Sequence, residues 1–205
     1  TGKKHGILFL DEINCVSETL APTMLQFLQC KTFGTHTLPQ GWIIVAAGNP
    51  PEYNKSVREL DVVTLDRVKR IDVREDLGVW KEYASRRGIY GAILAYLDSK
   101  PQNFYKMEST PGGKEFVTPR GWEDLSQLLY SYDALGLTAE QPTVEQYLQH
   151  PAVAKDFAAF LALWRRYNRD VDLAAILKGT FSESTVRRCA AAGFDEKLAL
   201  VGLLG

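Results

Sequence analysis

Two uninterrupted runs of large apolar residues stand out in the first quarter of the chain, and each ends abruptly in polar residues. Residues 6–10 (GILFL) run into an Asp-Glu pair, and residues 42–47 (WIIVAA) run into Gly-Asn-Pro-Pro. Continuous apolar runs of this length are typical of strands that are buried on both faces of a parallel sheet. We therefore expect two buried parallel strands with polar tips.

A helix and a third strand complete the layer that this pattern predicts. Residues 17–30 carry an apolar stripe at helical spacing, with Ser17 as a candidate N-cap, and a turn-rich segment follows. A helical turn over residues 60–67 precedes a shorter expected strand at residues 68–73. Strands that alternate with helices indicate an α/β layer.

Beyond residues 73–76 the strong periodicities are helical, and no further strand is predicted. Proline at a first helical position, as at Pro119 and Pro151, and glycine after a last turn, as at Gly88, Gly179 and Gly193, mark several boundaries. Helices are expected at residues 76–87, 89–98, 119–135, 143–149, 151–168, 171–178, 183–192 and 195–204.

Two features of this helical part bear on its core and its motion. The helix expected at residues 151–168 carries an apolar stripe at helical spacing, which predicts that one side of this helix faces the core. Trp122 is interpreted as a second core tryptophan. The segment 101–117, with Pro-Gly-Gly, is predicted to be the most mobile loop. The stripe consists of Val153, Phe157, Phe160, Leu161 and Trp164.

Composition narrows the class without identifying a function. The 205 residues are 45% hydrophobic with a net charge of -1, which suffices for a sizeable core and gives no general attraction to nucleic acid or anionic membranes. Cys15, Cys30 and Cys189 form no CxxC motif and are odd in number, which favours a reducing compartment. The apolar runs are far shorter than a membrane span and no signal peptide is evident, so we expect a cytoplasmic protein.

The polar strand tips are the strongest candidates for chemistry. Open parallel sheets bind ligands at the carboxyl ends of their strands, where Asp11, Glu12 and Asn49 are expected. An acidic pair in that place suits a metal ion or a water to be activated, and side-chain alternation predicts that the two carboxylates do different jobs. The plainer alternatives are a solvated strand end for the carboxylates and a turn amide for Asn49.

Taken in order, four segments resemble landmarks of the C-terminal part of an AAA+ ATPase module, most closely of its MoxR-like branch. The resemblance implies an α/β plus all-α fold: a truncated parallel-sheet P-loop NTPase core over residues 1–75 and a helical lid domain over residues 76–205. The segments are residues 7–14 (ILFLDEIN), similar to a Walker B strand, 46–50 (AAGNP), similar to a sensor-1 strand, 65–67 (LDR), similar to an arginine-finger segment, and 118–122 (TPRGW), similar to a sensor-2 helix start.

The resemblance also implies a role for each matching residue. Asp11 would hold Mg²⁺, Glu12 would polarise the water that attacks the γ-phosphate of ATP, and Asn49 would position that water. Arg67 would reach the nucleotide of a neighbouring subunit in a homo-oligomeric ring that remodels a protein client. Arg120 would contact nucleotide from the lid, and its place in a helix first turn, which favours an anion, supports that role.

Two alternatives concern the arginines and the histidines. Arg67 could instead form a surface ion pair, with Lys69 or Arg70 as the finger. The three histidines lack metal-ligand spacing, and Cys15 lacks an evident base, so structural roles are expected for them.

The sequence departs from the family pattern in one respect that affects function. It contains no G-x-x-x-x-G-K-[ST] phosphate-binding loop, and the nearest candidates, residues 1–4 (TGKK) and 112–115 (GGKE), fail the pattern. We therefore expect a fragment that begins after this loop and that binds and hydrolyses ATP poorly by itself.

Two other functions are compatible with the same resemblance. One is a non-hydrolysing regulatory or scaffold module of AAA+ fold. The other is a DNA-directed AAA+ protein, which the net charge does not favour but which a local basic patch would serve. The candidate patch consists of Arg165, Arg166, Arg169, Arg187 and Arg188.

Overall fold

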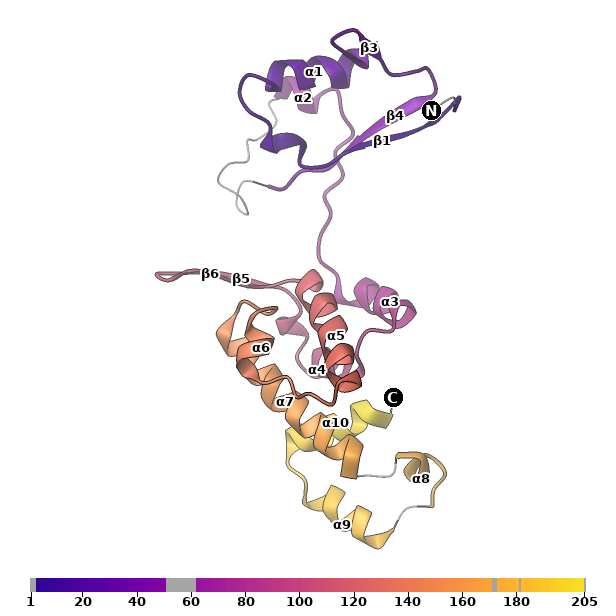
Figure 1. The fold of residues 1–205 in the computed structure, drawn as a ribbon, viewed down its shortest axis with the longest axis vertical. Coiled ribbons are helices and arrows are strands. Elements are labelled where there is room, and N and C mark those ends of the chain that lie inside the picture. Colours follow the sequence, from indigo (N-terminus) through magenta and orange to yellow (C-terminus); the bar gives the residue numbers. More distant parts are fainter. Residues whose placement is uncertain (1–2, 51–61, 171–172, 181, 205) are drawn as a thin grey trace. The chain divides into compact units, whose positions relative to one another are not determined.

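The computed structural model describes residues 3–50, 62–170, 173–180 and 182–204. The chain divides into two compact units, Thr1–Val73 and Arg74–Gly205, and each is described by itself. Both units combine helices with small sheets, so the fold class is mixed α/β (Figure 1). Among the described residues, no helix has both the length and the apolar character needed to cross a bilayer.

The first unit is built on two parallel strands, which confirms the two strands predicted from the apolar runs. Strand β1 (Gly6–Leu10) pairs with β4 (Trp42–Ala46) in a register that runs from Gly6 opposite Trp42 to Leu10 opposite Ala46. The other elements of the unit are η1 (Ile13–Cys15), α1 (Ala21–Cys30), β2 (Thr32–Phe33), β3 (His36–Thr37) and α2 (Val62–Leu65).

The prediction that these strands are buried on both faces is wrong for the described chain. Alternate side chains are half-buried, whereas Ile7, Phe9, Ile43 and Val45 are 66%, 58%, 61% and 42% exposed. A parallel strand is covered on both sides only where elements pack on both faces of a sheet. Here the described sheet has two strands, and one of its faces remains open.

Two further predictions for this unit need correction. Residues 68–73 are irregular rather than a third strand, because a short apolar stretch forms a strand only where a partner strand supplies its hydrogen bonds. The first helix begins at Ala21, and the Ser17 hydroxyl bonds the Thr19 hydroxyl (3.0 Å) instead of capping it. The helical turn before residue 67 is confirmed by α2, although residues 60–61 lie outside the described ranges.

The second unit is mainly helical, and most of its helices were predicted to within two or three residues. Its shortest predicted helix, at residues 143–149, is instead α6 (Gln141–Glu145) followed by a turn. The other helices are α3 (Leu77–Arg87), α4 (Gly91–Ser99), η2 (Pro101–Asn103), α5 (Pro119–Ala134), α7 (Pro151–Asp170), α8 (Leu173–Leu177), α9 (Glu183–Ala191) and α10 (Phe194–Leu204).

Capping residues explain why these helices begin and end where they do. The Asp76 carboxylate accepts the Val79 N–H (2.9 Å) at the start of α3, and the Thr118 hydroxyl accepts the Gly121 N–H (3.2 Å) at the start of α5. Gly88 ends α3 in the left-handed conformation with φ of 66°, as its place after the last turn predicts.

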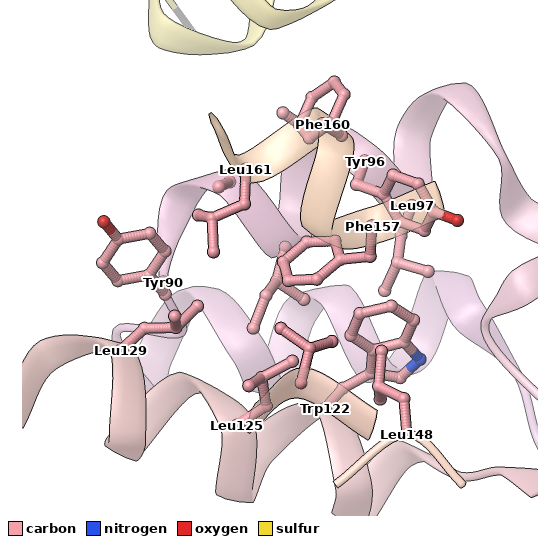
Figure 2. Close-up of a cluster of buried hydrophobic side chains, with 14 of the residues drawn as sticks. Tyr90, Tyr96, Leu97, Trp122, Leu125, Leu129, Leu148, Phe157, Phe160 and Leu161 are labelled. Carbon is pink, nitrogen blue, oxygen red and sulfur yellow. The ribbon is translucent and has the colours of Figure 1, made fainter. Parts of the chain in front are cut away.

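The core of the second unit is an aromatic and aliphatic cluster contributed mainly by α4, α5 and α7 (Figure 2). Trp122 is fully buried, its ring packs edge-on to Phe157 at 5.2 Å, and its indole N–H donates to the Phe104 carbonyl oxygen (3.1 Å). The stripe predicted on α7 is buried throughout, from Val153 to Trp164. Both tryptophans are therefore core residues, as predicted.

A β-hairpin forms where an irregular loop was predicted over residues 101–117, while the mobility of this segment stays a prediction. Strands β5 (Lys106–Thr110) and β6 (Gly113–Val117) pair antiparallel and extend away from the helices (Figure 1). The Phe116 N–H donates to the Gln149 carbonyl oxygen (2.8 Å), which anchors the hairpin base to the segment before α7. The expectation of an all-α second domain is therefore wrong.

Candidate functional site

The carboxyl ends of β1 and β4 are joined by main-chain hydrogen bonds that continue past the strands. The Ala47 N–H donates to the Leu10 carbonyl oxygen (2.8 Å), and the Ile13 N–H donates to the Ala47 carbonyl oxygen (2.9 Å). Residues 11–14 therefore lie beside residues 47–49, and we call these seven residues the sheet tip. The parallel register thus brings together three of the predicted site residues, Asp11, Glu12 and Asn49.

The backbone turns sharply at the acidic pair. Glu12 has φ of 52° and ψ of 41°, the left-handed conformation that residues with a β-carbon adopt at a cost of about 1–2 kcal/mol. One carboxylate oxygen of Asp11 accepts the Glu12 N–H (3.0 Å), which supports the turn. Because Glu12 has left the strand conformation, the alternation that predicted opposite faces for the two carboxylates does not extend to it.

Strain of this kind occurs disproportionately at functional sites, because a surrounding structure must hold it in place. Both side chains of the acidic pair are exposed, so they are accessible to a ligand from solvent. Both carboxylates therefore belong to an exposed turn that contains a left-handed residue.

A side-chain hydrogen bond ties the two halves of the sheet tip together. The Asn14 amide nitrogen donates to the Asn49 carbonyl oxygen at 2.7 Å. The Asn14 side chain also lies against Gly48, because a β-carbon on Gly48 would be 2.4 Å from the Asn14 amide oxygen. Asn14 and Gly48 lie in the segments 7–14 and 46–50 that carry the family resemblance, but the sequence assigned no role to either residue.

The oxygen donors at the sheet tip suit a hard cation. Mg²⁺ prefers oxygen ligands and is usually held by one or two carboxylates together with water and substrate phosphates. Asp11 and Glu12 supply two carboxylates, and Asn49 supplies an amide. Within the described part of the chain, no group of three or more His, Cys, Asp or Glu side chains could hold a metal ion.

The predicted arginine finger lies in the same unit as the sheet tip. Arg67 follows α2 and its side chain is exposed. The competing Arg70 donates through its Nε atom to the Asp72 carboxylate (2.7 Å), an exposed pair. The pairing engages Arg70 locally, and both arginines stay candidates for the finger.

Arg120 belongs to the second unit, where it is the second residue of α5 and is exposed. The first turn of this helix already satisfies several of its own donors. Pro119 has no N–H, and the N–H groups of Gly121 and Trp122 bond the hydroxyl and carbonyl oxygens of Thr118. An anion at this helix start would therefore depend on the Arg120 side chain more than on free main-chain N–H groups.

The histidines differ in their exposure to solvent, and the cysteines form no disulfide among the described residues. His5 and His36 are exposed, and His150 is buried at the start of α7 with its Nε2 atom 3.3 Å from a Glu108 carboxylate oxygen. The three cysteines are free thiols.

Comparison with known proteins adds no assignment. No protein-family model, curated protein or solved structure significantly matches this chain.

Proposed function

We propose that the sheet tip is the Mg²⁺-binding and water-orienting half of an ATP-hydrolysing site of the AAA+ type, close to the MoxR-like branch. The observation that carries this proposal is the parallel register of β1 and β4, which sets the acidic pair beside Asn49. The left-handed backbone at Glu12 supports it, because it marks the pair as a built turn.

In this proposal three residues of the sheet tip each have one task. Asp11 holds Mg²⁺, which supplies charge stabilisation for the transferred phosphoryl group when bound. Glu12 accepts a hydrogen bond from the attacking water and polarises it, while Asn49 fixes the position of that water from the neighbouring strand. Catalysis of phosphoryl transfer consists mainly of such positioning and charge stabilisation, so exposed oxygen donors at fixed spacing are suitable groups.

The proposed ATPase site needs further groups besides those of the sheet tip. The given sequence lacks the G-x-x-x-x-G-K-[ST] pattern, so in this proposal another segment supplies the phosphate-binding loop. We propose Arg67 as the finger that enters a neighbour's site in a ring and Arg120 as the lid residue that contacts nucleotide. The ring would use ATP turnover to remodel a protein client, in the cytoplasm.

Metal binding can be tested on this chain with Mn²⁺ in place of Mg²⁺. Paramagnetic broadening of amide NMR signals detects weak binding, and we expect it to be strongest at residues 11–12 and 48–49. Asp11→Asn should abolish that broadening, whereas Asp66→Asn, an exposed aspartate elsewhere in the unit, should leave it unchanged. Broadening that is uniform over the acidic surface would contradict the proposal.

Hydrolysis requires the natural protein that contains this sequence. Glu12→Gln there should retain ATP binding and lower the turnover number by about 10²-fold or more, a typical effect of removing a residue that polarises an attacking water. Glu82→Gln, at an exposed glutamate in the second unit, is the control and should leave turnover unchanged. Unchanged turnover in Glu12→Gln would reject the proposed role, and ATP binding without hydrolysis in the unsubstituted protein would favour a scaffold.

A further inference from the structure

We infer that Asn14 is a positioning residue that fixes Asn49 relative to the acidic pair, with Gly48 as the gap that admits it. The inference deepens the proposed function and rests on it for its catalytic meaning. Its structural part stands on the contacts of the sheet tip alone.

Residues 48–50 lie beyond the end of the β1–β4 ladder, so other contacts hold them in place. The β1–β4 ladder ends at the pair Leu10 and Ala46, and among the described residues the last main-chain link between the two segments is the Ile13 N–H bond to the Ala47 carbonyl oxygen. Asn49 lies two residues beyond that link. The hydrogen bond from the Asn14 amide to the Asn49 carbonyl oxygen, at 2.7 Å, extends the connection to Asn49 itself.

The reach of the Asn14 amide depends on the residue at position 48. Asparagine is short, so its side chain can bridge the two segments only if nothing stands between them. A β-carbon at position 48 would lie 2.4 Å from the Asn14 amide oxygen and 2.8 Å from its Cγ atom, both far inside van der Waals contact. Gly48 has no positive φ that would demand glycine, so close approach is the reason for glycine here.

The hydrogen bond from Asn14 to Asn49, together with the space left at Gly48, forms a clamp beside the acidic pair. Asn14 follows Glu12 by two residues, across the strained turn, so one short segment carries both the acidic pair and the group that holds Asn49. Displacement of Asn49 by 1 Å would misplace a water held between it and Glu12, and errors of that size cost catalysis about 10²-fold. Asn14 therefore acts through Asn49 and not on the substrate.

The experiment uses Asn14→Ala, Gly48→Ala and the double variant, with Gln29→Ala on the exposed side of α1 as control. Amide hydrogen exchange at Ile13 and Ala47 reports opening of the tip. Each single variant should lower the protection of these amides by about threefold to tenfold, the range expected for one hydrogen bond. The double variant should match the single ones, because either change breaks the same contact.

Mn²⁺ then separates a positioning role from a merely structural one. In Asn14→Ala, broadening at Glu12 should persist while broadening at residues 48–49 falls, because the distance from the metal to that segment changes. Unchanged protection, additive effects in the double variant, or unchanged broadening at Asn49 would each overturn the inference. If Mn²⁺ broadens no tip signal in the unsubstituted chain, the proposed function fails, and hydrogen exchange still decides whether the clamp exists.

Discussion

Gly121 in α5 packs so closely against Tyr147 that a β-carbon at position 121 would lie 2.7 Å from the Tyr147 carbonyl oxygen. That oxygen belongs to the main chain and cannot swing aside as a flexible side chain could. The contact therefore fixes the start of α5 against the segment between α6 and α7.

This contact predicts a reversal of the usual effect of glycine replacement in a helix. Alanine normally stabilises a helix by about 1 kcal/mol relative to glycine, but we expect Gly121→Ala to lower the free energy of unfolding by about 1–3 kcal/mol through overpacking. Gly112→Ala is the control, because its nearest neighbour would be 3.8 Å away. Denaturant unfolding measures both, and a stabilised Gly121→Ala variant would show that the contact relaxes at no cost.

The left-handed backbone at Glu12 predicts a second reversal, in the opposite sense. Glycine adopts this conformation without the β-carbon penalty, so Glu12→Gly should be more stable than Glu12→Ala by about 1 kcal/mol. At Gln29 inside α1 the order should invert, with alanine better than glycine by about 1 kcal/mol. Hydrogen exchange of the β1 and β4 amides measures the tip pair, and equal stability of the two Glu12 variants would argue against strain there.

Tyr90 predicts a loss of stability at alkaline pH. Burial, with a hydrogen bond to the Asp133 carboxylate (2.7 Å), raises the pKa of Tyr90 to about 12. A tyrosine in the unfolded chain titrates near pH 10, so between pH 10 and 12 unfolding releases a proton and the free energy of unfolding falls as pH rises. The stabilisation is complete below about pH 10.

The measurement compares unfolding from pH 9 to 11.5 in two variants that each lose one hydroxyl. Tyr90→Phe should be less stable than the unsubstituted chain at pH 9 and should flatten the alkaline slope. Tyr130→Phe, whose side chain is 51% exposed and packs on the Tyr90 ring, should leave the slope almost unchanged. An identical slope in Tyr90→Phe would assign the loss to other groups, such as Tyr96, whose pKa burial also raises.

The two faces of the β1–β4 pair should respond differently to the same substitution. Ile43 is exposed and Ile44 is half-buried, so Ile43→Thr should change the free energy of unfolding by less than about 0.5 kcal/mol, whereas Ile44→Thr should cost about 1–2 kcal/mol. Ile43→Thr should also reduce self-association, since open apolar faces favour it. Unfolding and analytical ultracentrifugation test both points, and equal losses at the two positions would show that both faces are covered.

The sequence by itself determined the elements whose signals are local. The helical periodicity, the proline and glycine at helix ends and the stripe on α7 all depend on neighbours within a few residues, so the helices and the buried Trp122 and Trp164 followed from them. The two apolar runs likewise identified β1 and β4. The polar residues that follow these runs placed Asp11, Glu12 and Asn49 at the same end of the sheet.

Only the tertiary structure decided the features that depend on distant partners. The hairpin β5–β6 has a polar, weakly patterned sequence, and cross-strand pairing together with the bond from Phe116 to Gln149 makes it a sheet. Residues 68–73 have a suitable composition and lack such a partner. The clamp between Asn14 and Asn49 joins residues 35 positions apart, and its geometry exists only once β1 and β4 are in register. The neighbouring residues in the sequence do not determine which distant group completes a hydrogen bond. These contacts are therefore set by the tertiary fold.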